Sequence, residues 1–105
     1  MVGLFCFLIY LIMDVIKLND QVSFGIKQEN KRLRLVVFEG GAELVCRKTS
    51  RTELVEFIRA ETGHLFKGRL QLDNSGGYIC VLVKGLQAGI VKTNQVAALL
   101  KLNQV

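Results

Sequence analysis

The side chains that most often carry out catalysis are scarce in this chain and stand apart from one another. His64 is the single histidine, and no serine, cysteine or aspartate at a recognisable spacing forms a triad with it. Glu53 and Glu56 share an expected helix with Arg59, where ion pairing and helix capping account for both carboxylates. No pair of a general acid and a general base is evident. We therefore expect a protein that is not an enzyme.

The cysteines and glycines give no sign of a metal site or a cofactor. Cys6, Cys46 and Cys80 are widely spaced, without a C-x-x-C pair or a neighbouring histidine, so neither zinc nor redox chemistry is expected. Cys46 and Cys80 stand among apolar residues in expected strands, where a free thiol usually behaves as a small core hydrophobe. Gly40-Gly41 precedes a strand rather than a helix, and the glycine patterns of nucleotide-binding loops do not occur. The expected compartment is the reducing cytoplasm.

Basic residues are the remaining candidates for function. The net charge is +5, and residues 62–105 carry +4 of it, because they hold five basic side chains against Asp73. Such an excess permits binding to nucleic acid or to an anionic membrane surface. Alternation along 66–72 predicts a basic stripe of Lys67, Arg69 and Gln71 on one face of a strand. The candidate nucleic-acid-binding residues are Arg32, Arg34, Lys67, Arg69, Gln71, Lys84 and Lys92.

Basic clusters and aromatic residues accompany these candidates along the chain. The two local clusters are Lys31, Arg32 and Arg34, and Arg47, Lys48 and Arg51. A solvated face explains each cluster when it is taken alone. The side chains with a ring that bases could stack on are Phe24, Phe38, Phe66 and Tyr78. A single aromatic residue is more often part of a core.

The first residues form an apolar segment that differs from the rest of the chain. Residues 2–13 are apolar, and Asp14 follows them. Twelve helical residues extend about 18 Å, less than the hydrocarbon core of about 30 Å. The basic leader and the cleavage site of a secretory signal are not present. Residues 1–13 are therefore a mis-assigned start before Met13, an ordered element that covers the body or a partner, or a membrane anchor, which is the least favoured of the three.

The rest of the chain alternates between strand patterns and helix patterns. Period-two alternation and turn residues predict strands at 21–27, 32–38, 42–47, 65–72, 78–84 and 88–92. Ser50-Arg51-Thr52-Glu53 is a capping box that begins a helix, and Thr62-Gly63 ends it. A second helix begins at Thr93 or Asn94. The expected class is α+β, with a tandem βββα-βββα order and two helices packed on an antiparallel sheet.

The same order of elements recurs as a weak internal repeat. Val36 and Val81 are 45 positions apart, as are Gly40 and Gly85. Identities are few, so a true duplication and a chance similarity both stay open. We expect residues 14–105 to form one domain built of two repeats, at about 21–62 and 64–102. The strand at 78–84 is apolar on both faces, which predicts a homodimer or a higher homo-oligomer.

The order of elements and the segment Lys67-Gly68-Arg69-Leu70-Gln71-Leu72 resemble the whirly class of single-stranded nucleic-acid-binding proteins, which includes the plant whirly proteins and Pur-alpha repeats. That class builds its fold from antiparallel strands followed by a helix, in tandem. This chain is shorter, and its expected repeats have three strands rather than four. The resemblance implies non-enzymatic binding of single-stranded DNA or RNA with little sequence preference. The alternative is an oligomeric structural or regulatory module that binds protein.

Overall fold

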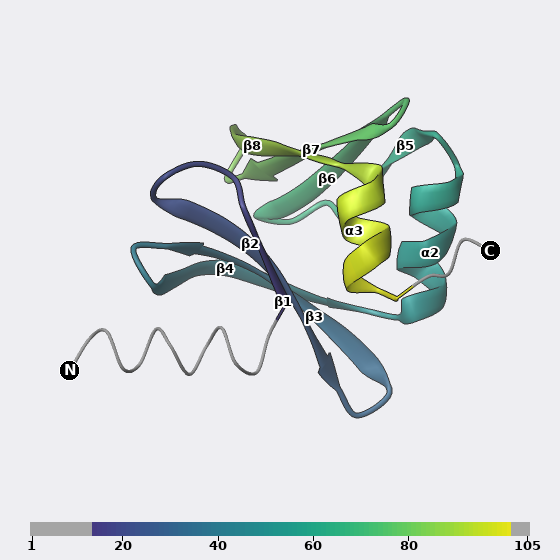
Figure 1. Cartoon of the computed structure of the whole chain (residues 1–105), viewed down its shortest axis with the longest axis horizontal. Helices are drawn as coiled ribbons and strands as arrows, with labels where there is room; N and C mark the ends of the chain where they lie inside the picture. Colours follow the sequence, from purple (N-terminus) through teal and green to yellow (C-terminus); the bar gives the residue numbers. More distant parts are fainter. Residues whose placement is uncertain (1–13, 102–105) are drawn as a thin grey trace.

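Two four-stranded antiparallel sheets and two helices make up residues 14–101, which are the residues that the computed structural model describes (Figure 1). The first sheet is formed by β1 (Asp14–Lys17), β2 (Val22–Glu29), β3 (Arg32–Glu39) and β4 (Ala42–Thr49). The second is formed by β5 (Thr62–Leu65), β6 (Leu70–Ser75), β7 (Tyr78–Val83) and β8 (Leu86–Lys92). The helices α2 (Arg51–Arg59) and α3 (Thr93–Leu99) follow the first and second sheets, respectively. The predicted α+β class with antiparallel strands is confirmed.

The predicted number of strands and the single shared sheet are wrong. The sequence does not reveal β1, because its two apolar residues, Val15 and Ile16, are adjacent and show no alternation. It does not reveal β5 either, because Thr62-Gly63 looks like the end of a helix. The strand predicted at 65–72 is instead two elements, since β5 ends at Leu65 and β6 begins at Leu70. Between them the chain leaves the extended conformation at Phe66, whose φ is +74°.

The hypotheses about the apolar segment at residues 1–13 lie outside the described residues. Neither helix within residues 14–101 has the length and the hydropathy that crossing a membrane requires.

The two helices lie side by side in Figure 1 and are in contact with each other.

The main hydrophobic core lies where the sheets and helices meet. β3 contributes Leu35 and Val37, β7 contributes Ile79 and Val81, and α2 contributes Leu54, all almost fully buried. The other buried members of this core are Phe24, Ile26, Leu33, Val45, Phe57, Ile58, Leu70, Leu72, Val91, Val96 and Leu100. We call the core-facing side of each sheet its inner face and the opposite side its outer face. Both halves of the chain therefore share one core.

The predicted start of α2 is confirmed, and its predicted end is too late. The Ser50 hydroxyl accepts a hydrogen bond from the Glu53 backbone N–H at 3.0 Å, as an N-cap should. The Glu53 carboxylate does not complete the expected capping box, because it accepts a hydrogen bond from the Thr49 hydroxyl. The helix ends at Arg59, and Glu61 takes a left-handed φ of +68°. A left-handed residue just beyond the last turn is a common way to end a helix.

Two long-range hydrogen bonds fasten the ends of the helices. The buried Asn74 side chain on β6 donates from Nδ2 to the Phe57 carbonyl in the last turn of α2, at 2.9 Å. The Arg51 guanidinium at the start of α2 donates to the Leu100 carbonyl just after α3, at 2.6 Å. Carbonyls in the last turn of a helix have no partner within the helix. The Phe57 carbonyl also accepts a hydrogen bond from the Ala60 backbone N–H at 3.3 Å, so Asn74 is a second donor to it. Both side-chain bonds join the two halves of the chain.

The two sheets also meet where the β1–β2 connection touches β8. A Cβ atom built on Gly89 would lie 2.7 Å from the Cβ atom of Leu18. Side chains do not tolerate so short a distance, so the absence of a side chain at Gly89 allows β8 to approach the first sheet.

The hairpins between the third and fourth strands have the same turn geometry in both halves. Gly40 and Gly41 have φ angles of +60° and +85°, and Lys84 and Gly85 have φ angles of +54° and +84°. Two successive left-handed residues are typical of the tight turn that matches the twist of paired strands. Both strand pairs also shift register close to the turn.

This geometry changes the spacing at which the halves correspond. The spacing of 45 positions places Val36 against Val81, yet Val36 belongs to a small cluster on the outer face and Val81 to the main core. A spacing of 44 places Val37 against Val81, both in the core, and Gly41 against Gly85. Because side chains alternate along a strand, only the spacing of 44 keeps equivalent residues on the same face.

The prediction that the thiols are core hydrophobes is wrong for Cys46 and only partly right for Cys80. Cys46 is exposed, and Cys80 is half-buried on the outer face of the second sheet. Their neighbours Val45 and Val81 take the core positions instead. Apolar neighbours in the sequence could not show this, because adjacent residues of a strand point to opposite faces.

Candidate nucleic-acid interface

Lys67 and Arg69 lie on an exposed loop rather than on a strand. The loop 66–69 joins β5 to β6, and both basic side chains are exposed there. The predicted stripe on one face of a sheet is therefore wrong for these two residues, and only Gln71 lies on β6. The structure instead presents the two cations on a short connection between adjacent strands.

Arg47 of β4 holds this loop against the first sheet. Its guanidinium carbon lies 4.9 Å from the centre of the Phe66 ring, which is cation–π geometry. Arg47 pairs with Leu35 in the register of β3 and β4, so it projects from the inner face of this edge strand toward the second sheet. A Cβ atom built on Gly68 would lie 3.3 Å from the Arg47 guanidinium, which shows how closely the loop approaches it.

Lys84 and Gln71 meet the same loop from the second sheet. The Lys84 backbone N–H donates to the Arg69 carbonyl at 2.7 Å, which places the β7–β8 turn beside the loop. The Gln71 side chain donates from Nε2 to the Gly68 carbonyl at 2.9 Å. Gln71 therefore supports the loop backbone, although it was predicted to bind nucleic acid.

We call Arg47, Lys67, Arg69 and Lys84, together with the Phe66 ring, the basic loop cluster. All four cations are exposed, and no carboxylate within residues 14–101 lies within 4.0 Å of them. Their charge is thus not cancelled by an ion pair in the described part of the chain. Along the sequence Arg47 belongs to the cluster with Lys48 and Arg51, and its contact with Phe66 depends on how the two sheets meet.

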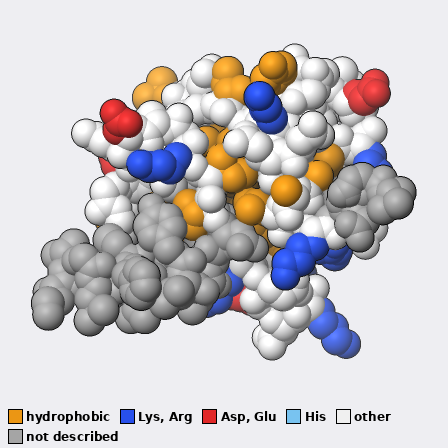
Figure 2. Space-filling view, in the orientation of Figure 1, with side chains coloured by type: hydrophobic (Ala, Val, Ile, Leu, Met, Phe, Trp, Pro, Cys, Tyr) orange, Lys and Arg blue, Asp and Glu red, His pale blue; other side chains and the backbone are white. Residues whose placement is uncertain are grey.

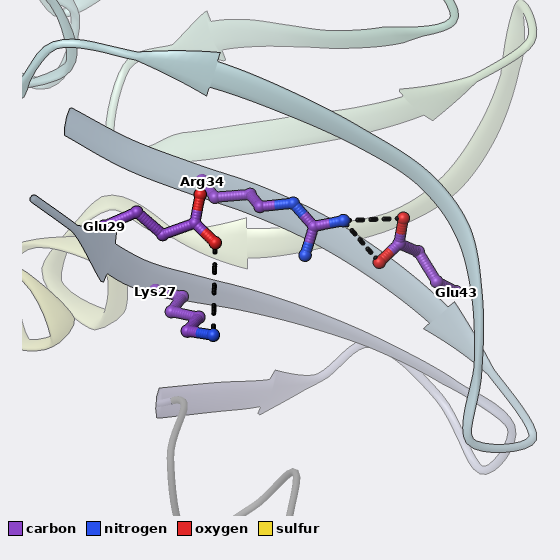
Figure 3. Close-up of polar contacts among 4 residues, drawn as sticks. All are labelled: Lys27, Glu29, Arg34 and Glu43. Carbon is purple, nitrogen blue, oxygen red and sulfur yellow. Dashed lines mark hydrogen bonds and ion pairs between the residues drawn. The ribbon is translucent and has the colours of Figure 1, made fainter.

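Arg32 and Arg34 lie elsewhere, on the outer face of β3. The Arg34 guanidinium donates to both carboxylate oxygens of Glu43, at 2.7 and 2.8 Å, as Figure 3 shows. Burial lowers the pKa of Arg34, but the hydrogen bond and the charge of Glu43 raise it, and the net direction is upward. Arg32 stands opposite Glu29 in the register of β2 and β3. Arg34 is therefore ion-paired, whereas Arg32 faces Glu29 without an ion pair within 4.0 Å in residues 14–101. The structure does not bring either arginine together with Lys67 and Arg69.

Lys27 and Lys92 are also separate from the basic loop cluster. Lys27 lies 3.9 Å from Glu29, the second ion pair in Figure 3. Lys92 pairs with Tyr78 at the opposite end of β7 from the β7–β8 turn. Five residue steps along β7 amount to about 17 Å, so Lys92 and Lys84 stand at the two ends of the second sheet.

Only one of the four candidate stacking residues has a freely exposed ring. Phe24 and Phe38 are buried, and Phe66 is half-buried beneath Arg47. Tyr78 has 53% of its surface exposed, on the outer face of the second sheet. Base stacking on Phe24 or Phe38 is thus ruled out in this fold.

His64 has a neighbour that the sequence does not identify. Its Nδ1 atom lies 3.8 Å from an Asp73 carboxylate oxygen across the β5–β6 pair, and both side chains are exposed. In residues 14–101, no three or more His, Cys, Asp or Glu side chains are grouped so that they could hold a metal ion.

The molecular surface combines scattered cations with exposed apolar groups. On the face shown in Figure 2, Lys and Arg side chains lie mostly apart from one another, with hydrophobic side chains exposed between them.

Comparison of the chain with protein-family models, with curated proteins and with solved structures found no match.

Proposed function

We propose that this protein is a non-enzymatic binder of single-stranded DNA or RNA, with little sequence preference, and that the basic loop cluster contacts the phosphates. The observation that carries the proposal is the convergence of Arg47, Lys67, Arg69 and Lys84 from three parts of the chain without a neighbouring carboxylate in the described residues. Cations that contact phosphates release counterions, and this supplies most of the free energy of non-specific binding.

The arrangement favours a single strand over a duplex groove. Lys67, Arg69 and Lys84 sit on short connections between strands, and Arg47 lies on the edge strand β4, so none of the four is on a helix that could enter a groove. Electrostatic contacts to phosphates carry no base information, so little sequence preference is expected. Four such contacts to a single strand predict a slope of about −3 in a plot of log affinity against log salt concentration.

The test is the binding of a fluorescently labelled oligothymidine, followed by anisotropy at several salt concentrations. The variant Lys67→Glu/Arg69→Glu reverses two of the four charges, so we expect at least a tenfold loss of affinity and a shallower salt slope. Replacing oligothymidine by mixed-sequence DNA or RNA of equal length should change the affinity by less than about threefold, because the contacts are to phosphates.

The matched control is Lys17→Glu/Lys31→Glu. It changes the net charge by the same amount at two exposed positions of the first sheet, Lys17 on β1 and Lys31 in the β2–β3 turn. A smaller loss in this control than in the loop variant supports a local site. Equal losses in both variants, or binding that does not depend on salt, would refute the proposal.

We also propose that the two halves are a tandem repeat of a ββββα unit, related to the whirly class. Four strands precede each helix, as in that class, and the third hairpins agree in turn geometry at a spacing of 44 positions.

We further propose a cytoplasmic location, because the free thiols of Cys46 and Cys80 fit a reducing compartment.

The second candidate function is an oligomeric structural or regulatory module that binds protein and no nucleic acid. Exposed apolar side chains on the second sheet favour it, because Tyr78 and Ile90 each expose 53% of their surface. A stable oligomer without measurable oligonucleotide binding would select this function over the first.

A further inference from the structure

The outer face of the second sheet is an exposed surface with an apolar centre. Tyr78, Cys80 and Leu82 alternate along β7 on this face, and Ile90 on β8 stands opposite Cys80. Ser75, Tyr78, Cys80 and Ile90 line a shallow hollow there. Contiguous exposed apolar surface on a folded domain often marks an interaction site. We call Tyr78, Cys80, Leu82 and Ile90 the apolar face.

Opposite charges flank the apolar face on its two sides. Asp73 stands opposite Cys80 on the neighbouring strand β6. Lys92 stands opposite Tyr78 on the other neighbour, β8. The surface thus has an acidic side toward β6 and a basic side toward β8. Two copies can therefore pair opposite charges, provided that the acidic side of one copy lies over the basic side of the other.

We propose that the apolar face binds the same face of a second copy of this chain, around a two-fold axis that runs parallel to β7. Rotation about this axis places the β6 side of each copy over the β8 side of the other. Asp73 then approaches the partner's Lys92, and the apolar centres cover each other. A two-fold interface uses one surface on both subunits, which is the commonest arrangement of homo-oligomers.

The charges discriminate against the other two-fold arrangement. An axis that lies across the strands would place Asp73 over the partner's Asp73, and β8 over the partner's β8. Like charges facing each other in a partly desolvated interface are unfavourable. Asp73 beside the apolar centre also disfavours phosphates and anionic lipid headgroups as the occupants of this face.

The proposed arrangement leaves the basic loop cluster free. Lys84 and Arg69 lie beyond the end of β7, and an axis parallel to β7 keeps this end on the same side in both copies. If the proposed function holds, the dimer brings two such clusters to one end. The dimer itself does not depend on nucleic-acid binding.

The first test measures self-association of the full-length chain by sedimentation velocity over a wide range of concentrations. We expect a monomer–dimer equilibrium that Ile90→Lys weakens at least tenfold, because it places a charge at the apolar centre. Leu86→Lys is the matched control, since Leu86 is 75% exposed near the β7–β8 turn and outside the apolar face. Circular dichroism checks that both variants fold.

The second test exchanges the flanking charges. Asp73→Lys and Lys92→Asp should each weaken the dimer several-fold, because each places like charges opposite each other. The double variant Asp73→Lys/Lys92→Asp restores the complementarity and should return the dissociation constant to within about threefold of the original.

The third test links the two copies through Cys80. In the variant Cys6→Ser/Cys46→Ser, a short bis-maleimide should join two chains, as each Cys80 thiol adds across one maleimide double bond and its proton passes to the ring carbon. Facing sheets are about 10 Å apart, so a spacer suits this geometry better than a direct disulfide. Adding Ile90→Lys should abolish the linked dimer.

A monomer at every concentration would overturn the proposal, and so would a dimer that survives Ile90→Lys. A swapped double variant that stays as weak as either single variant would overturn the orientation of the axis. None of these measurements involves nucleic acid, so failure of the dimer and failure of the proposed function are distinguishable.

Discussion

The guanidinium of Arg47 covers the Phe66 ring at 4.9 Å and thereby fixes a basic loop of the second sheet against the edge strand of the first. Lys67 and Arg69 follow Phe66 directly, so the position of two candidate phosphate contacts depends on a neutral ring. The contact also explains why a half-buried aromatic residue stands at the start of an otherwise exposed loop.

Replacing the ring should weaken nucleic-acid binding without a change in charge. Phe66→Leu keeps an apolar side chain but removes the cation–π contact, which is worth about 0.5 to 1 kcal/mol at exposed sites. We expect about a two- to fivefold loss of oligothymidine affinity, measured by anisotropy at low salt. Phe66→Tyr keeps the ring and should bind as the original chain does. Unchanged affinity in Phe66→Leu would show that the loop is positioned by other contacts.

Asn74 should be important for stability, although it is polar. Asn74 is 4% exposed and donates to the Phe57 carbonyl, so Asn74→Ala removes a buried hydrogen bond and leaves that carbonyl with the Ala60 N–H as its donor. We expect the free energy of unfolding in urea to fall by about 1 to 3 kcal/mol. Ser75→Ala, at the exposed neighbouring position, should change it by less than about 0.5 kcal/mol. Equal effects of the two substitutions would contradict this role.

A methyl group at position 89 should disturb the contact between the sheets. In Gly89→Ala the new Cβ atom would lie 2.7 Å from the Leu18 Cβ atom, so one backbone segment must shift. We expect a loss of about 1 to 3 kcal/mol in urea denaturation. Leu18→Gly removes the opposing side chain, and the double variant should lose less than the sum of the single losses. Strict additivity would show that the two positions do not interact.

Cys80 should react slowly with iodoacetamide at neutral pH. Burial raises the pKa of its thiol above the ordinary value of 9.0, and the negative charge of Asp73 raises it further. Because the thiolate is the nucleophile, a raised pKa moves the alkylation profile to higher pH. Asp73→Asn should move the profile back toward lower pH, as followed by mass spectrometry of the Cys6→Ser/Cys46→Ser chain. If Asp73→Asn leaves the pH dependence of alkylation unchanged, the charge of Asp73 does not contribute to the raised pKa of the Cys80 thiol.

The same shift has a consequence for stability. A thiol whose pKa is higher in the folded chain than in the unfolded chain stabilises the fold below the unfolded pKa, and this contribution is lost as the pH rises through the folded value. The Cys80 contribution should therefore disappear under alkaline conditions rather than in acid.

Helix caps and strand alternation could be predicted from the sequence, because each depends only on residues a few positions apart. The Ser50 cap and the alternation in β3 and β7 each depend on neighbouring residues only, and the structure has all three. β1 and β5 have four residues each, too few for a clear alternation, and they exist because they pair with β2 and β6. Strand pairing between distant residues is not encoded in the pattern of either strand alone.

The candidate site was harder to predict for the same reason. Lys67 and Arg69 were recognised by their charge, but the loop conformation arises from the left-handed backbone at Phe66 and from its contact with Arg47. The ion pair of Arg34 and Glu43 crosses the β3–β4 hairpin next to a shift of register. One extra residue in a strand changes which side chains face each other, so this partner could not be identified by counting along the sequence.

The hydrogen bonds at the helix ends also limit how this chain can be divided. The second half supplies Asn74 to the end of α2, and the first half supplies Arg51 to the carbonyl that follows α3. A break between the halves would leave each fragment with an open apolar surface and with a helix-end carbonyl that had lost its side-chain donor from the other half. The two halves have the same order of elements, yet each depends on the other for its core and for a hydrogen bond at a helix end, so we expect neither to fold by itself.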